Sequence, residues 1–167
     1  MTTVIIKDEQ ETDAKAIYNL TEIAFKPKAY SDGTEAPLVG QLRTDGDLII
    51  SLVALIDERL VGHVAFSKVT INSSHNDWYG LGPISVHPDV QKQGIGGLLI
   101  NEGFARLKAL GANGCALIGD PKYYKRFGFK NDGRLSYPNV PEEAVMWISF
   151  CDQTPSGLLK FRPAFGE

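Results

Sequence analysis

A glycine-rich segment joins a predicted strand to a predicted helix: Val86-His-Pro-Asp-Val-Gln-Lys-Gln-Gly-Ile-Gly-Gly97. At a helix N-terminus the first backbone N–H groups have no partner inside the helix and the dipole is positive, so a phosphate group is favoured there. Glycines let the backbone approach such a group without a Cβ in the way. The dinucleotide fingerprint G-x-G-x-x-G needs glycine where Leu99 stands, and no Gly-Lys-Ser/Thr triplet of a P-loop occurs. The segment therefore predicts a phosphate site of another kind, with a ligand-free glycine turn as the alternative.

The elements around this segment include both strands and helices. Apolar and β-branched runs predict strands over Thr3–Lys7, Leu48–Ile56, Leu60–Ile71, Tyr79–Val86, Cys115–Ile118, Ala144–Cys151 and Leu158–Arg162. Helical spacing and capping residues predict helices from Thr12 or Asp13 onwards, over Glu35–Arg43, from Gly94 to Leu110 and over Pro121–Phe127. Hairpins are expected at both ends of the chain, with a strand–helix–strand crossover in the middle. This order predicts a mixed sheet with helices on both faces.

Composition excludes several classes of function. The chain has 167 residues, 43% of them hydrophobic, which fits one compact domain, and its net charge of −3 argues against nucleic-acid binding as its main task. Neither H-E-x-x-H nor C-x-x-C occurs, so no metal site is predicted, and Cys115 and Cys151 predict no disulfide framework. The longest nearly apolar run, Leu48–Ile56, is too short to span a membrane, and residues 1–7 lack the features of a signal peptide. We therefore expect a cytoplasmic protein without a membrane span.

Charge is distributed unevenly along the chain. Residues 91–130 contain seven basic and two acidic side chains, a local charge of +5, which leaves −8 on the rest of a chain whose total is −3. An anionic ligand bound by the basic stretch is one explanation. Ordinary variation of surface charge is the other.

Two blocks of residues resemble a known family. Gln91-Lys-Gln-Gly-Ile-Gly96 resembles the Q/R-x-x-G-x-G/A signature of the GNAT superfamily of acetyl-CoA-dependent N-acetyltransferases. Further along, Tyr123-Tyr124-Lys-Arg-Phe-Gly-Phe129 is similar to the family's Y-x-x-x-G-F segment, with Tyr124 in the tyrosine position. The resemblance covers roughly residues 3 to 130 and is loose beyond Asn131. It implies one N-acetyltransferase domain over residues 1–167, with an α/β (mixed α+β) fold, a mostly antiparallel sheet of six to seven strands and helices on both faces.

The resemblance assigns the acetyl-CoA site largely to backbone groups. The groups implied to bind the pyrophosphate are the backbone N–H groups of Gln91, Lys92, Gln93, Gly94, Ile95, Gly96 and Gly97. The pantetheine arm is implied to lie along free backbone groups of Ile84, Ser85 and Val86, and one of these amides also stabilises the oxyanion. Pro83 has no N–H, so a departure from regular strand pairing is expected there. The basic stretch then coincides with the predicted cofactor side.

Tyr124 is implied to contact the cofactor and to act as general acid towards the departing thiolate. The ordinary pKa values of a tyrosine, near 10, and of a thiol, near 8.5, make full proton transfer uphill by about 2 kcal/mol. Donation of a hydrogen bond is therefore a sufficient role. Packing beside Phe127 and Phe129 is the alternative.

The acceptor is implied to be a primary amine of a small molecule or peptide that attacks the thioester directly. Such an amine must lose a proton, and Glu22, Glu35 and Asp120 are candidate bases, although each is also typical of a capping or solvated carboxylate. His63 and His87 are expected to be structural. A non-catalytic acyl-CoA-binding regulatory module is the alternative function. A homodimer through the late strands is one assembly that the resemblance allows.

Overall fold

The structure, a computed structural model, describes residues 3–166. These residues divide into two compact units. The first is built from the chain up to Phe66 together with Gly82–Phe104, and the second from Ser67–Leu81 together with the chain from Ala105 onwards. Three elements contribute residues to both units: strand β3 (Arg59–Lys68), strand β5 (Trp78–Val86) and helix α3 (Ile95–Ala109).

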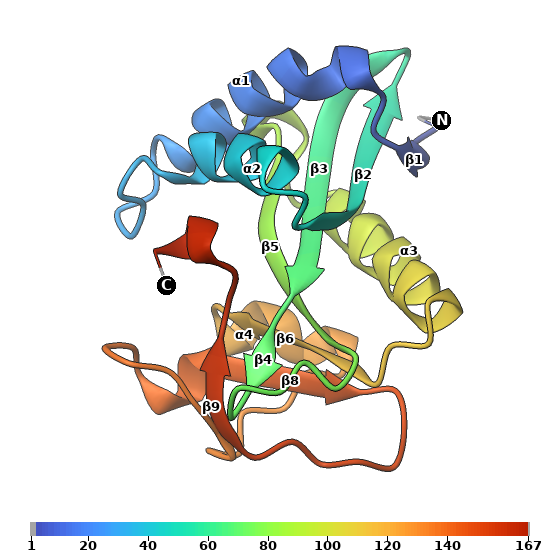
Figure 1. Cartoon of the computed structure of the whole chain (residues 1–167). Coiled ribbons are helices and arrows are strands. Elements are labelled where there is room, and N and C mark those ends of the chain that lie inside the picture. Colours follow the sequence, from blue (N-terminus) through green and yellow to red (C-terminus); the bar gives the residue numbers. More distant parts are fainter. Residues whose placement is uncertain (1–2, 167) are drawn as a thin grey trace. The chain divides into compact units, whose positions relative to one another are not determined.

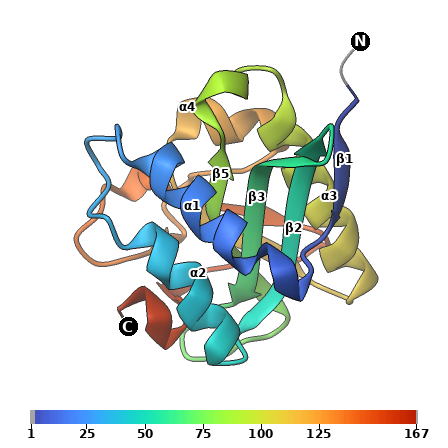
Figure 2. The same cartoon turned by 90° about the horizontal axis from the view of Figure 1, so that it is seen from above.

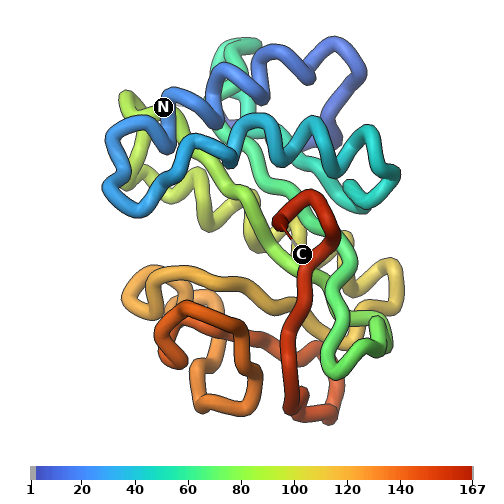
Figure 3. Tube along the Cα trace, turned by 60° about the vertical axis from the view of Figure 1, so that its left-hand side comes forward, coloured from blue at the N-terminus to red at the C-terminus, as the bar shows by residue number. Residues whose placement is uncertain are grey.

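The first unit has helices on both faces of its strands. Its other elements are β1 (Ile5–Asp8), η1 (Glu11–Asp13), α1 (Ala14–Phe25), α2 (Glu35–Thr44), β2 (Leu48–Ile56) and η2 (Pro88–Val90). Strand β1 pairs antiparallel with β2. Helices α1 and α2 lie side by side over one face of β2 and β3, and α3 lies on the other face (Figure 1 and Figure 2). The segment that connects α1 to α2, residues 26–34, is seen in Figure 3.

The sequence pattern of α1 explains how it packs. Its buried residues recur at helical spacing: Ile17, Leu20, Thr21 and Ala24. Ile17 forms a buried cluster with Val39 of α2 and Val53 of β2. Burying side chains of this size stabilises the fold by about 1.5–3 kcal/mol each, so the two helices are attached mainly by this face.

The second unit contains a small sheet and the remaining strands of the main sheet. Its other elements are β4 (Thr70–Ile71), β6 (Gly114–Ile118), α4 (Pro121–Tyr124), η3 (Lys125–Phe127), β7 (Leu135–Ser136), η4 (Glu142–Ala144), β8 (Val145–Ser149), β9 (Gly157–Lys160) and η5 (Pro163–Phe165). Strand β6 pairs parallel with the start of β5 and antiparallel with β8. Strand β9 pairs antiparallel with β4 and parallel with β7.

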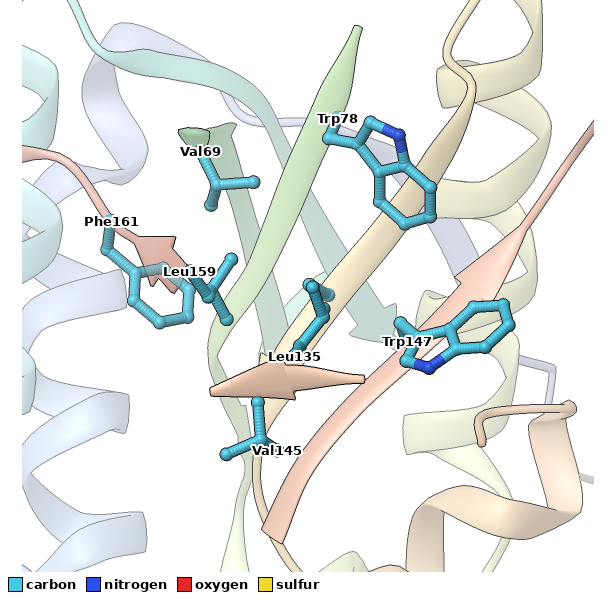
Figure 4. Close-up of a cluster of buried hydrophobic side chains, with 8 residues drawn as sticks. Val69, Trp78, Leu135, Val145, Trp147, Leu159 and Phe161 are labelled. Atoms are coloured by element: carbon cyan, nitrogen blue, oxygen red, sulfur yellow. The ribbon is translucent and has the colours of Figure 1, made fainter. Parts of the chain in front are cut away.

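Large apolar side chains from distant segments form the core of the second unit. Trp78 of β5 and Trp147 of β8 are buried together with Phe161, which follows β9 (Figure 4). Leu135 of β7 and Leu159 of β9 belong to the same cluster. The small sheet is therefore held by side-chain burial as well as by its few backbone hydrogen bonds.

The predicted mixed architecture is confirmed. The main sheet is mostly antiparallel and has six strands in the order β1-β2-β3-β5-β6-β8, and the small sheet has the order β4-β9-β7. The predicted strand Leu60–Ile71 is interrupted at Val69. The expected C-terminal hairpin is wrong, because β8 pairs with β6 while β9 pairs with β4 and β7. Strand β7 was not predicted, since two residues are too few to show a period.

Membrane-spanning and metal-binding features are both missing from residues 3–166. No helix in this range is long and apolar enough to cross a membrane. The same residues contain no group of three or more His, Cys, Asp or Glu side chains that could hold a metal ion. Both cysteines are free thiols, with Cys115 buried and Cys151 exposed.

Candidate active site

Strand β5 departs from regular pairing with β3. The Val69 N–H donates to the Trp78 carbonyl at 3.2 Å, and the His87 N–H donates to the Val61 carbonyl at 2.8 Å, so the two strands run antiparallel. Between these bonds β5 has one residue more than β3, which defines a one-residue bulge. Pro83, which has no N–H, lies in this interval. The interval of irregular pairing, between Trp78 and His87, therefore contains Pro83, where a departure was predicted.

Beyond the bulge, some backbone groups of β5 point away from β3. Because the His87 N–H faces β3, the alternation of an extended chain turns the N–H groups of Ile84 and Val86 to the opposite edge. Within residues 3–166, the parallel pairing of β5 with β6 extends only as far as Gly80. Two backbone donors at this edge are thus available to a ligand, which is what the predicted pantetheine site requires.

Side chains hold the start of the glycine loop against the end of β5. The Gln91 amide nitrogen Nε2 donates to the Val86 carbonyl at 3.0 Å. His87 Nδ1 accepts a hydrogen bond from the Asp89 N–H at 3.1 Å and caps η2. His87 is therefore a turn residue, as expected. Gln91, the first signature residue, uses its side chain to fix the path of the loop.

The loop then turns at two residues with positive φ. Lys92 has φ +63° and Gly94 has φ +87°. Left-handed residues alternating with residues of negative φ direct successive N–H groups towards one concave point, an arrangement that binds anions. The first helical bond runs from the Leu98 N–H to the Gly94 carbonyl at 3.1 Å, so the N–H groups of residues 95–97 precede the helical ladder. These donors fit a pyrophosphate, which is multiply anionic.

Packing against β3 fixes the N-terminus of α3 at the end of the glycine loop. Ile95 and Leu99 are buried, and a Cβ placed on Gly62 of β3 would lie 3.1 Å from the nearest side-chain atom of each. Such a distance is shorter than an ordinary contact between carbon atoms. The helix can therefore approach β3 this closely only because residue 62 is glycine. The donors at the start of α3 are thus attached to a rigid element.

Tyr124 lies in the second unit, at the end of α4. Its ring makes edge contacts with Tyr123 and Phe129, at centroid distances of 4.9 and 5.9 Å. A Cβ on Gly119 would lie 2.5 Å from Cε2 of Tyr124, so the glycine that follows β6 makes room for the ring. The α4 turn begins at Asp120, whose carboxylate accepts from the Lys122 N–H at 2.9 Å. The half-buried ring is therefore held on several sides.

The carboxylates predicted as candidate bases have local structural partners or sit on the helix exterior. Asp120 is the N-cap of α4. Glu35 accepts a hydrogen bond from the Ser31 hydroxyl at 2.6 Å. Glu22 is exposed on α1. These environments are those of capping and solvated carboxylates, which was the alternative interpretation of all three.

A polar chain that the sequence did not reveal leads from the partly exposed Arg43 and Glu9 to the buried Ser51 and His63 in the first unit, and we call it the buried chain. Arg43 Nε and Nη2 donate to the two carboxylate oxygens of Glu9 at 2.9 and 3.0 Å, the Ser51 hydroxyl donates to Glu9, and His63 Nε2 lies 2.7 Å from Ser51 Oγ. An open pocket of about 260 Å³ adjoins this chain and is lined by Asp8, Glu9, Arg43, Leu48, Ile49 and Ser51. The one signal in the sequence was His63, which interrupts the apolar run of residues 60–66.

Electrostatics within the buried chain follow from its partners. Burial lowers the pKa of His63 to about 4, and the Glu9 carboxylate, which favours the imidazolium, does not compensate. For Glu9, burial acts to raise the pKa, but hydrogen bonds from Arg43 and Ser51 outweigh it and hold the pKa below its ordinary value. Near neutral pH this arrangement is a neutral histidine next to an ion pair.

Comparison with known proteins identifies the family. Residues 48–131 match the model of the acetyltransferase (GNAT) domain. The N-acetyltransferase YhbS of Escherichia coli K12 is 37% identical over 160 residues, which cover 93% of this chain and 92% of the relative.

Solved structures extend the comparison to the whole chain. A GNAT family acetyltransferase from Brucella melitensis, crystallised in complex with acetyl-CoA, is 42% identical with a TM-score of 0.88 and 98% coverage of both chains. The structure of E. coli YhbS in complex with CoA has a TM-score of 0.89 at 31% identity, covering 100% of this chain and 94% of that one. This chain, with its strand–loop–helix segment and its tyrosine turn, belongs to the GNAT family of N-acetyltransferases.

Proposed function

We propose that this chain transfers the acetyl group of acetyl-CoA to a primary amine of a small molecule or peptide. The observation that carries the proposal is the donor set at the end of β5 and the start of α3. The positive φ values of Lys92 and Gly94 give the backbone N–H groups there a conformation that suits an anion, and packed side chains fix the helix that follows. The structures of the two relatives with acetyl-CoA and CoA support the choice of ligand.

Binding is assigned to backbone and side-chain groups of two segments. The N–H groups of residues 91–97 bind the pyrophosphate, and Lys92 adds a positive charge to that site. The backbone N–H groups of Ile84 and Val86 bind the pantetheine arm at the free edge of β5, and Ser85 lies between them. One of these amides stabilises the oxyanion that forms when the amine attacks the carbonyl carbon.

The chemistry is a direct acyl transfer. Bound acetyl-CoA supplies an activated thioester, whose C–S bond breaks as the C–N bond forms. Tyr124 contacts the departing sulfur and donates a hydrogen bond to it, which stabilises the thiolate without full proton transfer. The packing of the Tyr124 ring against Gly119 and Phe129 supports this role, because a hydroxyl on a fixed ring loses little entropy when it donates.

Thiol release measured over a panel of amines tests the proposal. We expect CoA to be released from acetyl-CoA with at least one class of primary amine, and the product amine to carry the acetyl group by mass spectrometry. The panel should contain polyamines, amino sugars, amino acids and peptides with free N-termini or lysines. Tight acetyl-CoA binding by calorimetry without turnover on any amine would instead indicate a regulatory acyl-CoA-binding module.

A further inference from the structure

The hydrogen-bond directions in the buried chain assign the tautomer of His63. The Ser51 hydroxyl has one proton, and it donates that proton to Glu9. Ser51 Oγ, 2.7 Å from His63 Nε2, must therefore accept from the ring. The proton of the neutral imidazole is on Nε2, which leaves a lone pair on Nδ1. Glu9 and Ser51 thus present His63 to the interior of the first unit as a base.

A second buried polar atom without a partner among the described residues, the Ser85 hydroxyl, lies on the neighbouring strand β5. His63 is 0% exposed and Ser85 is 2% exposed. Within residues 3–166, neither His63 Nδ1 nor Ser85 Oγ has a hydrogen-bond partner. Buried polar atoms in this state are rare in folded proteins and cost about 1–3 kcal/mol each, so the pair requires an explanation.

Strand register relates the two groups. The bond from the His87 N–H to the Val61 carbonyl sets Val61 of β3 opposite His87, the residue that follows β5. With the extra residue of β5 on the Trp78 side of Ser85, antiparallel pairing two residues further into the sheet places Ser85 opposite His63, with both side chains on one face and their Cβ atoms about 5 Å apart. A hydroxyl donor and an imidazole lone pair are complementary, and a rotation of the Ser85 side chain would form the hydrogen bond that the two groups do not make in this structure. Ser85 also lies between Ile84 and Val86, the backbone donors of the proposed pantetheine site.

We propose that His63 is the proton acceptor of the acetyl transfer and that Ser85 carries the proton to it. This inference rests on the proposed function. Glu9 and Ser51 are positioning residues: they hold the imidazole in the Nε2-protonated tautomer, and the Glu9 carboxylate stabilises the imidazolium that forms. Arg43 in turn fixes the Glu9 carboxylate through two hydrogen bonds.

The protons and bonds of this step balance. The amine nitrogen bonds to the acetyl carbonyl carbon and gives its proton to Ser85 Oγ as the Ser85 proton moves to His63 Nδ1. When the C–S bond breaks, the coenzyme leaves with the bonding electron pair. The imidazolium then returns its proton to Ser85, and the Ser85 proton passes to the sulfur. The products are the amide and the CoA thiol, and both side chains end in their starting states.

The charged groups around His63 suit a base that must be neutral at rest. Glu9, which follows β1, and Arg43 of α2 are the charged groups that act on it, and the uncharged hydroxyls of Ser51 and Ser85 come from the strands on either side. Because burial lowers the pKa of His63 to about 4, the neutral imidazole is present throughout the neutral range, and its protonation depends on the Glu9 carboxylate to stabilise the imidazolium.

Nitrogen NMR of the full-length chain without any substrate tests the tautomer directly. Two-bond proton–nitrogen correlations distinguish protonated from unprotonated ring nitrogens. We expect an unprotonated Nδ1 and a protonated Nε2 for His63 between pH 6 and 8. A proton on Nδ1 would leave no lone pair facing Ser85 and would overturn the proposal whether or not the enzyme turns over.

Kinetics with acetyl-CoA and the best amine of the panel test the proton transfer. We expect His63→Gln to lower kcat about 100-fold and Ser85→Ala about tenfold, with the KM for acetyl-CoA within twofold of wild type. Ser51→Ala should lower kcat about tenfold, and Ser51→Thr should restore it. Ser67→Ala is the matched control. Like the Ser85 hydroxyl, the Ser67 hydroxyl on β3 is buried and has no partner in the described chain. The kcat of Ser67→Ala should stay within twofold.

The pH profile separates this role from a structural one. Hydroxide replaces a lost base as the pH rises, so the ratio of wild-type to His63→Gln kcat should shrink between pH 7 and pH 10. A ratio that is constant with pH, or wild-type kcat in His63→Gln, contradicts the proposal while leaving the proposed function standing. A wild-type chain that binds acetyl-CoA but acetylates no amine overturns the proposed function, and the role of His63 with it.

Discussion

Tyr124 shows how a single residue depends on its neighbours. The ring fits against Gly119, and its edge contacts to Tyr123 and Phe129 limit its rotation. We predict that Tyr124→Phe lowers kcat at least tenfold and leaves the KM for acetyl-CoA within twofold, because only the donor to the leaving sulfur is removed. Steady-state thiol release measures both constants.

The adjacent tyrosine is the control for that substitution. Burial raises the pKa of Tyr123, and its ring stacks against the Arg126 guanidinium at 4.8 Å, so its role is in packing. Tyr123→Phe should keep kcat within twofold. A Tyr124→Phe enzyme with kcat within threefold of wild type at every pH would show that the Tyr124 hydroxyl takes no part in the transfer.

At the scale of one element, the glycine loop can be tested through its backbone conformation. Gly94 has φ +87°, and a Cβ at this position would meet no atom within 4 Å, so Gly94→Ala adds backbone strain of about 1–2 kcal/mol without a steric clash. Relief of that strain would rotate the N–H groups that the loop presents. We predict about tenfold weaker acetyl-CoA binding by calorimetry.

Gly46, in the turn before β2, provides the matched variant. It has φ +76° and nothing within 4 Å of a Cβ, so Gly46→Ala carries a similar strain in a different element. Its melting temperature should fall about as much as that of Gly94→Ala, with unchanged acetyl-CoA affinity. Equal acetyl-CoA affinities in the two variants would show that the loop takes no part in binding the coenzyme.

For the whole molecule, the buried His63 links stability to pH. The pKa of His63 is about 4 in the folded chain and near 6.5 when unfolded, so the unfolded chain binds more protons between these values. The stability is therefore complete above about pH 6.5 and decreases as the pH falls towards 4. We predict a loss of about 2 kcal/mol in the free energy of unfolding between pH 7 and pH 5, measured with urea.

Replacement of the titrating group provides the control for this stability effect. His63→Gln should be less stable than wild type at pH 7 but should lose much less stability between pH 7 and pH 5. An equal pH dependence in the two proteins would assign the effect to other groups.

The uneven distribution of charge is also a property of the whole molecule. If the +5 of residues 91–130 attracts the anionic coenzyme, salt should weaken the interaction by screening. We predict that the dissociation constant for acetyl-CoA rises severalfold between 50 and 500 mM NaCl in calorimetric titrations. An unchanged constant would indicate that binding relies on the backbone donors rather than on the summed charge.

Much of the fold and part of the candidate site could be predicted from short stretches of the sequence. The strand ending at Val86, the helix ending before Gly111 and the loop glycines were predicted because caps, turns and periodic apolar residues act over a few neighbours. The family signature is local in the same sense, since consecutive residues form its donor set. The C-terminal pairing was missed because a strand's partner depends on competition between distant segments for burial.

Consecutive residues alone indicated a glycine-rich strand–loop–helix segment and a resemblance to N-acetyltransferases, because both are local properties of the chain. The folding of the chain in three dimensions brought Glu9, Ser51 and His63 from separate segments into one hydrogen-bonded chain and buried His63 Nδ1 without a partner among residues 3–166. Hydrogen-bond partners on different strands are set by register and packing, and neither can be read from spacing along the chain.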